Sequence, residues 1–218
     1  MLVGHLAAGM LAKRVEPRLS LGTAVLGAMA ADFLWCAFLL AGIEQVQYHP
    51  GVGAANYLTA LNIAWSHSLL TNALWAALLG SAYFLIRRQA RAAWVLAAAV
   101  LSHWLLDVVA HRPDMALAPG VHLYLGLGLW TSVPATLAVE GGFWVIALVA
   151  YARTARPSGR LGSYVLWIGA ALLTLVWYLN IAGPPPRHPE TAPVSSLIFF
   201  SLVVAWAYWT NRLRRAQA

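Results

Sequence analysis

Residues 91–110 read RAAWVLAAAVLSHWLLDVVA, a run in which Arg91 and Asp107 are the charged members. A helix rises about 1.5 Å per residue, so a helix of this length crosses the roughly 30 Å hydrocarbon core of a bilayer. The stretch is therefore predicted to be a membrane-spanning helix. The same prediction places His103 and Asp107 inside the membrane.

Further runs share this length and apolar character: residues 20–43, 64–86, 127–151, 161–182 and 192–209. The composition agrees with them, because only 10% of the residues are charged, whereas roughly a quarter are charged in soluble domains. Residues 1–12 are too few to span and are expected to insert partway or to pack against the other helices. We predict an all-α membrane protein, a polytopic bundle of six transmembrane helices plus a short N-terminal half helix. A single integral membrane domain covers residues 1–218.

The basic residues alternate between the predicted loops. Twelve of the 14 Lys and Arg residues fall on one side, in residues 13–18, 87–91, 152–160 and the C-terminal tail, while Arg112 and Arg187 are on the other. The positive-inside rule assigns the basic side to the cytoplasm. We expect a multi-pass protein of the inner (plasma) membrane with a cytoplasmic C-terminus. Basic clusters between apolar runs also argue against nucleic acid as a partner.

Ionisable side chains inside the predicted spans share a depth. Counting the helix rise from the inner surface places four of them about 18 to 24 Å deep; they are His103, Asp107, Asp32 and Glu140. Each costs roughly 2.5–3.5 kcal/mol at the centre of a bilayer, so four at one depth indicate a functional site in its outer half. The alternative is a polar network that only joins helices.

A local motif favours a metal site. His103, Asp107 and His111 recur at i, i+4 and i+8, and residues i and i+4 lie on one helix face, so His103 and Asp107 can chelate one cation. His111 is expected to reach a second ion, to orient Asp107 or to cap the helix. Imidazole with carboxylate suits Zn, Fe or Mn. Cys36 is the only cysteine, which excludes a Cys-based zinc motif.

Other spans supply candidate partners for this motif. His67 opens the third helical segment from the outer side, and Asp32 is the one carboxylate of its span. Asp32 suits a bridging ligand or a base for metal-bound water. His5 is expected about 12 Å deep, shallower than the rest, so its participation requires the half helix to tilt.

Four short motifs occur in a fixed order: Gly4-His5, Ala31-Asp32, Ser66-His67-Ser68, and Ser102-His103 through Asp107. With them the chain resembles, over roughly residues 4–120, the YdjM-like family of bacterial inner-membrane metal-dependent hydrolases, which is similar by motif to zinc-dependent phospholipases C. The resemblance implies that His67, His103 and Asp107 hold one divalent metal, with Zn the first candidate before Mn and Fe. It further implies that Asp32 bridges to that metal or activates water, and that His5 serves a second metal.

Two departures from the family pattern bear on the second metal. The family's aspartate motif continues with Asp and His residues where this chain has Phe33, Leu34 and Trp35, and a family histidine falls here on Asn62. One tightly bound metal is therefore expected, although Glu140 and His111 could compensate.

The expected function is metal-assisted hydrolysis, in which Asp32, or Glu140 in its place, takes the proton from water. A site at outer-leaflet depth suits a phosphoester of a lipid or of another membrane-associated substrate at the outer face. The alternatives are a non-catalytic metal or haem carrier, a metal transporter, and a seven-helix hydrolase similar to the alkaline ceramidases. The ceramidase pattern needs a late HxxxH pair, and none follows His122. The sequence does not predict the oligomeric state.

Overall fold

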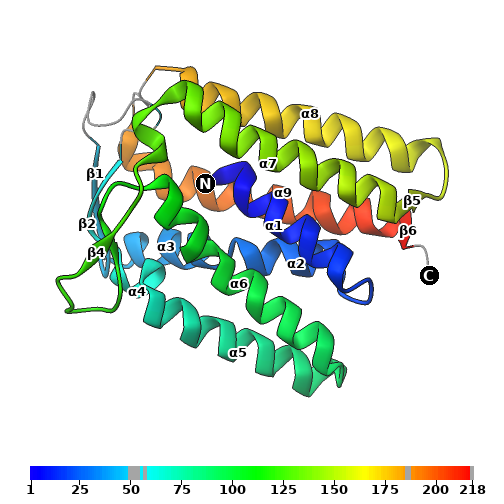
Figure 1. The fold of residues 1–218 in the computed structure, drawn as a ribbon, viewed down its shortest axis with the longest axis horizontal. Helices are drawn as coiled ribbons and strands as arrows, with labels where there is room; N and C mark the ends of the chain where they lie inside the picture. The colour runs from blue at the N-terminus through cyan, green and yellow to red at the C-terminus, as the bar shows by residue number, and fades with distance from the viewer. Residues whose placement is uncertain (49–54, 56–57, 185–187, 217–218) are drawn as a thin grey trace.

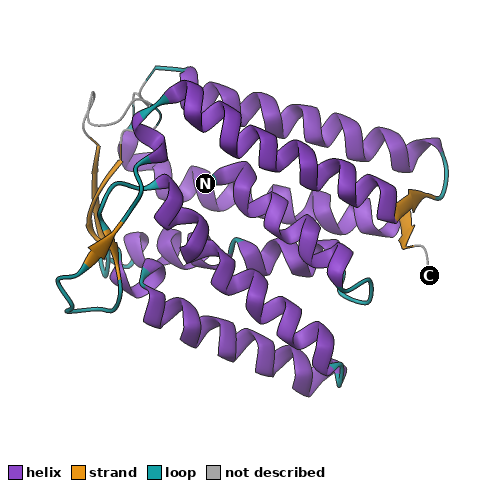
Figure 2. Ribbon diagram, in the orientation of Figure 1, coloured by secondary structure: helices purple, strands orange, loops and turns teal. Residues whose placement is uncertain are grey.

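The computed structural model describes residues 1–48, 55, 58–184 and 188–216 as a helical bundle with three short two-stranded pairs (Figures 1 and 2). The helices are α1 (Leu2–Val15), α2 (Leu21–Ala28), α3 (Ala30–Leu40), α4 (Ala64–His67), α5 (Leu69–Arg87), α6 (Ala90–Ala110), α7 (Val133–Thr154), α8 (Arg160–Ala182) and α9 (Ala192–Arg212). The antiparallel pairs are β1 (Gln45–Tyr48) with β2 (Leu58–Asn62), β3 (Met115–Ala116) with β4 (Tyr124–Leu125), and β5 (Ala155–Pro157) with β6 (Arg214–Ala216).

The all-α membrane bundle predicted from the sequence is confirmed. Within the described chain five helices, α5 to α9, are long and apolar enough to cross a membrane, and α2 with α3 makes a sixth candidate span. The run 20–43 is not one continuous helix, because α2 and α3 meet at a bend of 53°. The bend lies at Met29, between Ala28, which ends α2, and Ala30, which begins α3.

Two other apolar runs, 64–86 and 127–151, also differ from the helices that form there, because of local backbone conformation. The run 64–86 is interrupted at Ser68, whose extended backbone ends α4 and whose hydroxyl caps the N-terminus of α5. The run 127–151 becomes helical only at Val133, because Gly128 adopts a positive φ of 71° and Ser132 caps α7. A short 3-10 turn, Leu129–Thr131, occupies the gap, and another, Pro189–Thr191, precedes α9. The apolar composition of a run does not indicate where its helix is interrupted.

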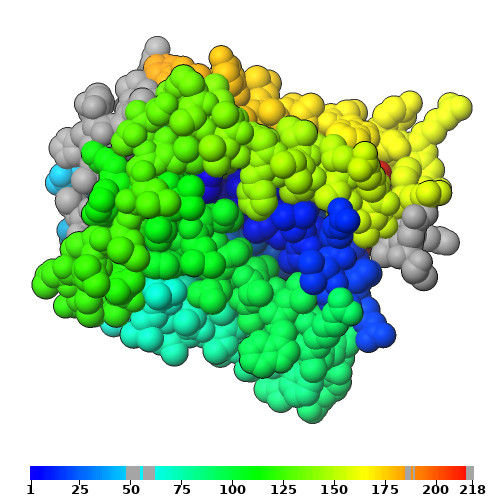
Figure 3. Space-filling model, in the orientation of Figure 1, coloured from blue at the N-terminus to red at the C-terminus, as the bar shows by residue number. Residues whose placement is uncertain are grey.

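The half helix expected at residues 1–12 is α1, and it lies in the interior of the bundle. It packs against α7, α2 and α6. On the face of the molecule that Figure 3 shows, α6 and α7 cover its N-terminal half. Its side chains are buried on several sides, including those of Val3, Leu6 and Met10. A helix of 14 residues cannot span the bilayer, so the surrounding spans shield it.

The two ends of the bundle differ in charge and in structure. The α1–α2, α5–α6 and α7–α8 connections and the C-terminal strand β6 lie at one end, and β1, β2 and β4 lie at the other (Figure 1). Apart from Arg112, the basic residues of the described chain belong to the first end; Arg187 lies outside the described residues. The side of the membrane that each end faces stays a prediction.

Gly9 sets the distance between α1 and α2, because a Cβ atom there would lie 2.8 Å from the Cα atom of Val25. We expect Gly9→Ala to destabilise the purified protein by about 1–3 kcal/mol, as overpacked cores do. The matched control is Gly142→Ala, since a Cβ atom at Gly142 meets nothing within 4 Å. Thermal unfolding in detergent checks this, and an equal melting temperature for Gly9→Ala and wild type would contradict the close packing.

Candidate metal centre

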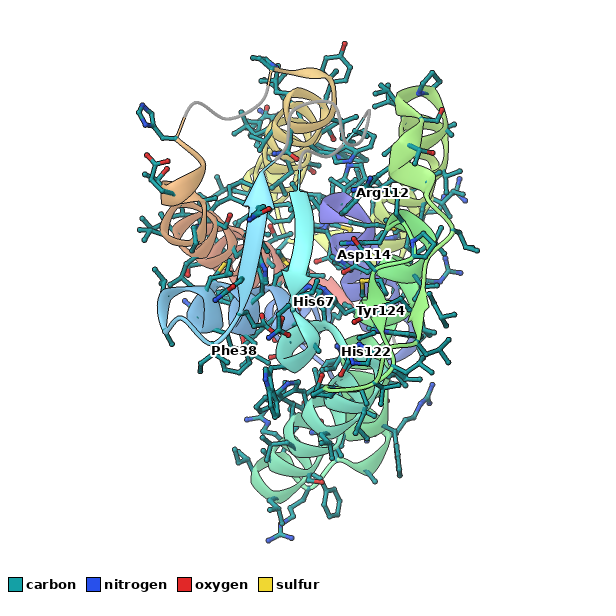
Figure 4. All side chains as sticks on the ribbon, turned by 90° about the vertical axis from the view of Figure 1, so that its left-hand side faces the viewer. Phe38, His67, Arg112, Asp114, His122 and Tyr124 are labelled. Atoms are coloured by element: carbon teal, nitrogen blue, oxygen red, sulfur yellow. The ribbon has the colours of Figure 1, made fainter. Side chains whose placement is uncertain are left out.

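Side chains from three helical segments place their ligand atoms together in the half of the bundle that carries β1 and β2. We call Asp32 of α3, His67 of α4 and His103 and Asp107 of α6 the donor cluster. His67 lies centrally in Figure 4, which looks onto this end between β2 and the loop bearing Asp114 and Tyr124. All four residues were predicted from the sequence, and the structure brings them together.

The nitrogen and oxygen atoms of the donor cluster are spaced as ligands of one ion. His103 Nε2 lies 3.2 Å from both His67 Nε2 and Asp107 Oδ2, and His67 Nε2 lies 3.7 Å from Asp107 Oδ2. Asp32 Oδ1 lies 3.7 and 3.8 Å from the two histidine nitrogens. Ligands of a tetrahedral zinc ion with bonds of about 2.0–2.1 Å are separated by about 3.3 Å. The residues present therefore fit a small divalent cation.

The other nitrogen of each histidine fixes which atom faces the cluster. His103 Nδ1 lies 2.8 Å from the carbonyl oxygen of Ala28, which can only accept, so Nδ1 carries a proton and donates it. The bend after α2 brings this carbonyl to α6. In the neutral ring Nε2 then keeps its lone pair and directs it at the cluster, as in metal-ligating histidines.

His67 is oriented by a relay through Ser66 to Glu44. The Ser66 hydroxyl donates to Glu44 Oε2 at 2.7 Å and lies 2.6 Å from His67 Nδ1. Because the hydroxyl has one proton and Glu44 receives it, His67 Nδ1 is the donor toward Ser66. The Ser66 backbone N–H also donates to Glu44 Oε1 at 2.7 Å. His67 Nε2 thus directs a lone pair at the cluster, like His103.

Sequence reasoning missed Glu44. It follows α3 in the loop before β1 and is only 2% exposed. Burial raises the pKa of the Glu44 carboxyl, and the hydrogen bonds from Ser66 oppose the rise. The signal in the sequence was a lone carboxylate between residues 44 and 63, a stretch without any other charged residue.

The donor cluster consists of acceptors pointed at one another. With both Nδ1 atoms donating outward, two imidazole lone pairs face each other across 3.2 Å beside two carboxylates. Asp107 is 3% exposed and His103 is fully buried, so water cannot screen the negative potential of these groups. Such an arrangement is stabilised by a cation or a proton held between the donors, and the structure shows buried groups that can hold a metal ion.

His5 joins the site from α1. Its ring stacks on His103 with centroids 3.7 Å apart, and its Nε2 lies 3.2 Å from Asp107 Oδ1 and 2.9 Å from the Met1 nitrogen. The Met1 nitrogen itself lies 2.7 Å from Asp107 Oδ1. The two oxygens of Asp107 therefore face different partners, His103 through Oδ2 and His5 through Oδ1.

His5 lies at the level of His103, and not at a shallower one as expected, because the end of α1 lies beside the start of α6. Arg91, at the start of α6, donates to the carbonyl of Val15, at the end of α1, at 2.9 Å. His5 is ten residues from Val15 and His103 twelve from Arg91, so both reach a similar depth at about 1.5 Å per residue.

Glu140 and His111 lie beside the donor cluster and outside it. Glu140 Oε1 accepts a hydrogen bond from the Gly4 N–H at 3.1 Å, which fastens the N-terminal turn of α1 to α7. His111 Nδ1 lies 3.0 Å from Asp114 Oδ1, and its ring packs on Trp130 with centroids 4.5 Å apart. Both residues line the cavity described next, and their roles stay predictions.

A cavity of about 610 Å³ adjoins the donor cluster. Asp32, His67 and Asp107 form part of its wall, and Asp32 is the most open of them with 19% of its side chain exposed. Much of the remaining wall is apolar, from α3, α8 and α9; it includes Trp35, Trp177, Ile181, Phe199 and Phe200. The size lies within the range of small-molecule sites.

Comparison with known proteins gives one finding. The family model described as YdjM inner membrane protein matches residues 1–183, a range that contains every residue of the donor cluster. No curated protein and no solved structure matches the chain.

The relay predicts the tautomer of His67, which nitrogen chemical shifts measure directly. In metal-free protein with ¹⁵N-labelled histidine at about pH 8, where unperturbed rings are neutral, we expect His67 to be protonated at Nδ1. Ser66→Ala should move a large fraction of His67 to the Nε2-protonated form.

Ser68→Ala is the matched control, because Ser68 is equally buried and adjacent but bonds Thr71. Identical His67 shifts in Ser66→Ala and wild type would contradict the relay.

Proposed function

The chain belongs to the YdjM inner membrane protein family, and on this premise we propose that this multi-pass membrane protein is a metal-dependent hydrolase. The observation that carries the proposal is the convergence of four acceptor atoms with neighbouring pairs 3.2–3.8 Å apart, beside a cavity that Asp32, His67 and Asp107 line. A structural polar network would pair donors with acceptors throughout. Here the Met1 nitrogen pairs with Asp107 Oδ1, but the two Nε2 atoms and Asp107 Oδ2 face one another, with a space for substrate beside them.

His67, His103 and Asp107 would hold the cation, with zinc as the first candidate before manganese and iron. Two imidazoles and one carboxylate are three protein ligands, the number that catalytic rather than structural zinc sites have, and would leave one position for water or substrate. A divalent cation supplies Lewis acidity there, polarising a phosphoester oxygen and a water molecule. Ala28 and the Ser66–Glu44 relay keep both Nε2 atoms aimed at it.

Asp32 suits the role of general base. Its side chain is 19% exposed, against 3% for Asp107, and it lines the cavity, so its carboxylate can reach a proton on water there. Glu140 is the second candidate, but one of its oxygens already accepts the Gly4 N–H, and its 1% exposure leaves it less accessible.

The substrate would be a phosphoester of a lipid or of another membrane-associated molecule, reached from the outer face. The donor cluster lies toward the end of the bundle opposite the basic residues, which the positive-inside rule assigns to the cytoplasm. Asp107 is three residues from the outer end of α6, or about 5 Å along the helix axis. That depth matches the region where lipid headgroups meet their chains.

The metal part of the proposal is tested by metal content. Purified wild-type protein is expected to carry one zinc, manganese or iron ion per chain by elemental analysis, and His103→Ala should reduce the content at least tenfold. His122→Ala is the matched control, because His122 is exposed in the loop before β4 and should leave the content unchanged. Stoichiometric metal in His103→Ala would overturn the assignment.

The catalytic part is tested by Asp32→Asn. In a panel of phospholipid liposomes we expect headgroup release by wild type and a loss of roughly 10²–10⁴-fold in the variant, the usual share of a general base. Metal content should persist in the variant, whereas its loss would make Asp32 a ligand. Stoichiometric metal without release from any lipid by wild type would favour a carrier, and metal movement across the liposomes a transporter.

A further inference from the structure

Helices α8 and α9 are fastened to each other at their inner ends. Trp206 of α9 donates from Nε1 to the carbonyl of Val165 at 2.9 Å, and its ring lies so close to Gly169 that no Cβ atom would fit there. Arg214, just beyond α9, donates to the carbonyl of Gly162 at 3.1 Å. Small residues on α8 thus allow tight packing through the inner half of the pair.

At their outer ends the same two helices flank the cavity. The lining residues of α8 and its C-terminal end are Val176, Trp177, Leu179, Asn180, Ile181 and Pro184, and those of α9 are Ala192, Ser195, Ser196, Phe199 and Phe200. The pair is therefore joined by these contacts on the inner side, while both helices line the cavity on the outer side. Asp32, His67 and Asp107 of the donor cluster line the same cavity.

The helix faces beside the opening lie in the hydrocarbon region. Both helices are long enough to span the membrane, and Val176 and Leu179 of the lining are 41% and 55% exposed. What lies against such a face in a bilayer is a lipid chain, since the core contains almost no water. Part of the cavity lining therefore belongs to helix faces that meet lipid from the side.

The polar lining residues lie where a lipid's polar part would pass. Asn180 is two residues from the C-terminus of α8, and Ser195 and Ser196 are in the first turns of α9. The aromatic rings of Phe199 and Trp177 lie deeper along the same helices. The lining thus offers an amide and two hydroxyl groups among apolar side chains in its outer turns and aromatic rings beneath them, as an amphiphile requires.

We propose that an acyl chain of a phospholipid occupies the space between the outer halves of α8 and α9, so that the substrate enters laterally from the outer leaflet. This inference rests on the proposed function for the identity of the group that reacts. The chain lies against Trp177 and Phe200 while the headgroup reaches the donor cluster, and a free, water-soluble phosphoester lacks the part that this lining binds.

Photolabelling tests the chain site without requiring turnover. The protein is placed in liposomes that contain phosphatidylcholine with a diazirine in its acyl chain, irradiated, and mapped by peptide mass spectrometry. Bulk lipid labels exposed residues such as Ile198, which is 58% exposed. Trp177 and Phe200 are only 6% and 9% exposed, so adducts on them report a chain inside the cavity.

Ser196→Trp fills the opening and should lower the adducts on Trp177 and Phe200 at least fivefold, with Ser196→Leu giving an intermediate decrease. Ile198→Trp is the matched control on the same helix, and because Ile198 does not line the cavity it should leave these adducts unchanged. Absence of adducts on both residues in wild type, or equal yields in Ser196→Trp and Ile198→Trp, would overturn the proposal.

The two proposals can fail separately. Metal-free His103→Ala should still be labelled at Trp177 and Phe200, because the chain site does not need the ion. Labelling of Trp177 and Phe200 without headgroup release by wild type would support the acyl-chain site between α8 and α9 and contradict the proposed hydrolase activity. Headgroup release that is undiminished in Ser196→Trp would instead show that the substrate reaches the donor cluster by another path.

Discussion

Two imidazole lone pairs and two carboxylates face one another inside a membrane-spanning bundle, and much of the structure serves to hold them there. His103 and Asp107 are too buried for water to screen them, so the repulsion among the acceptors must be offset by positive charge, from the Met1 nitrogen beside Asp107 Oδ1 and from a cation or a proton between the donors. The outward hydrogen bonds of His103 to Ala28 and of His67 to Ser66 prevent either ring from turning its Nδ1–H inward. The same bonds that orient the ligands therefore create the demand for a positive charge.

The irregularities of the bundle occur where this arrangement requires them. Around the bend at Met29, Asp32 lies near the two histidine nitrogens and the Ala28 carbonyl accepts from His103. The break at Ser68 ends α4 directly after His67 and leaves it near the Glu44 loop. The short α1 brings His5 and the Gly4 N–H into the interior. Breaks in membrane helices are tolerated when other groups satisfy the freed backbone, as here.

Asp32, His103 and Asp107 were identifiable from the sequence because each is costly in lipid and two of them share one helix face, and His67 from its place at the outer start of an apolar run. Glu44 was not, because a carboxylate in a predicted loop carries no such cost until the loop is found to be buried. His5 was placed too shallow, because the level at which α1 ends is set by the contact between Val15 and Arg91. The bend within residues 20–43 was not predicted, since an apolar run has the same composition with or without a bend.

The sequence by itself determined that the chain is a membrane bundle and which segments are long and apolar enough to span, and it predicted one depth for four ionisable residues, because hydrophobic length and the cost of buried charge act locally along each segment. Only the tertiary structure decided which of their atoms meet, which nitrogen of each histidine faces inward, and that α8 and α9 flank the cavity beside them. Those features depend on helix rotation, on bends and on contacts between residues far apart in the chain, such as Glu44 with Ser66 or Trp206 with Val165. The periodicity of a single segment does not indicate which other segments pack against it.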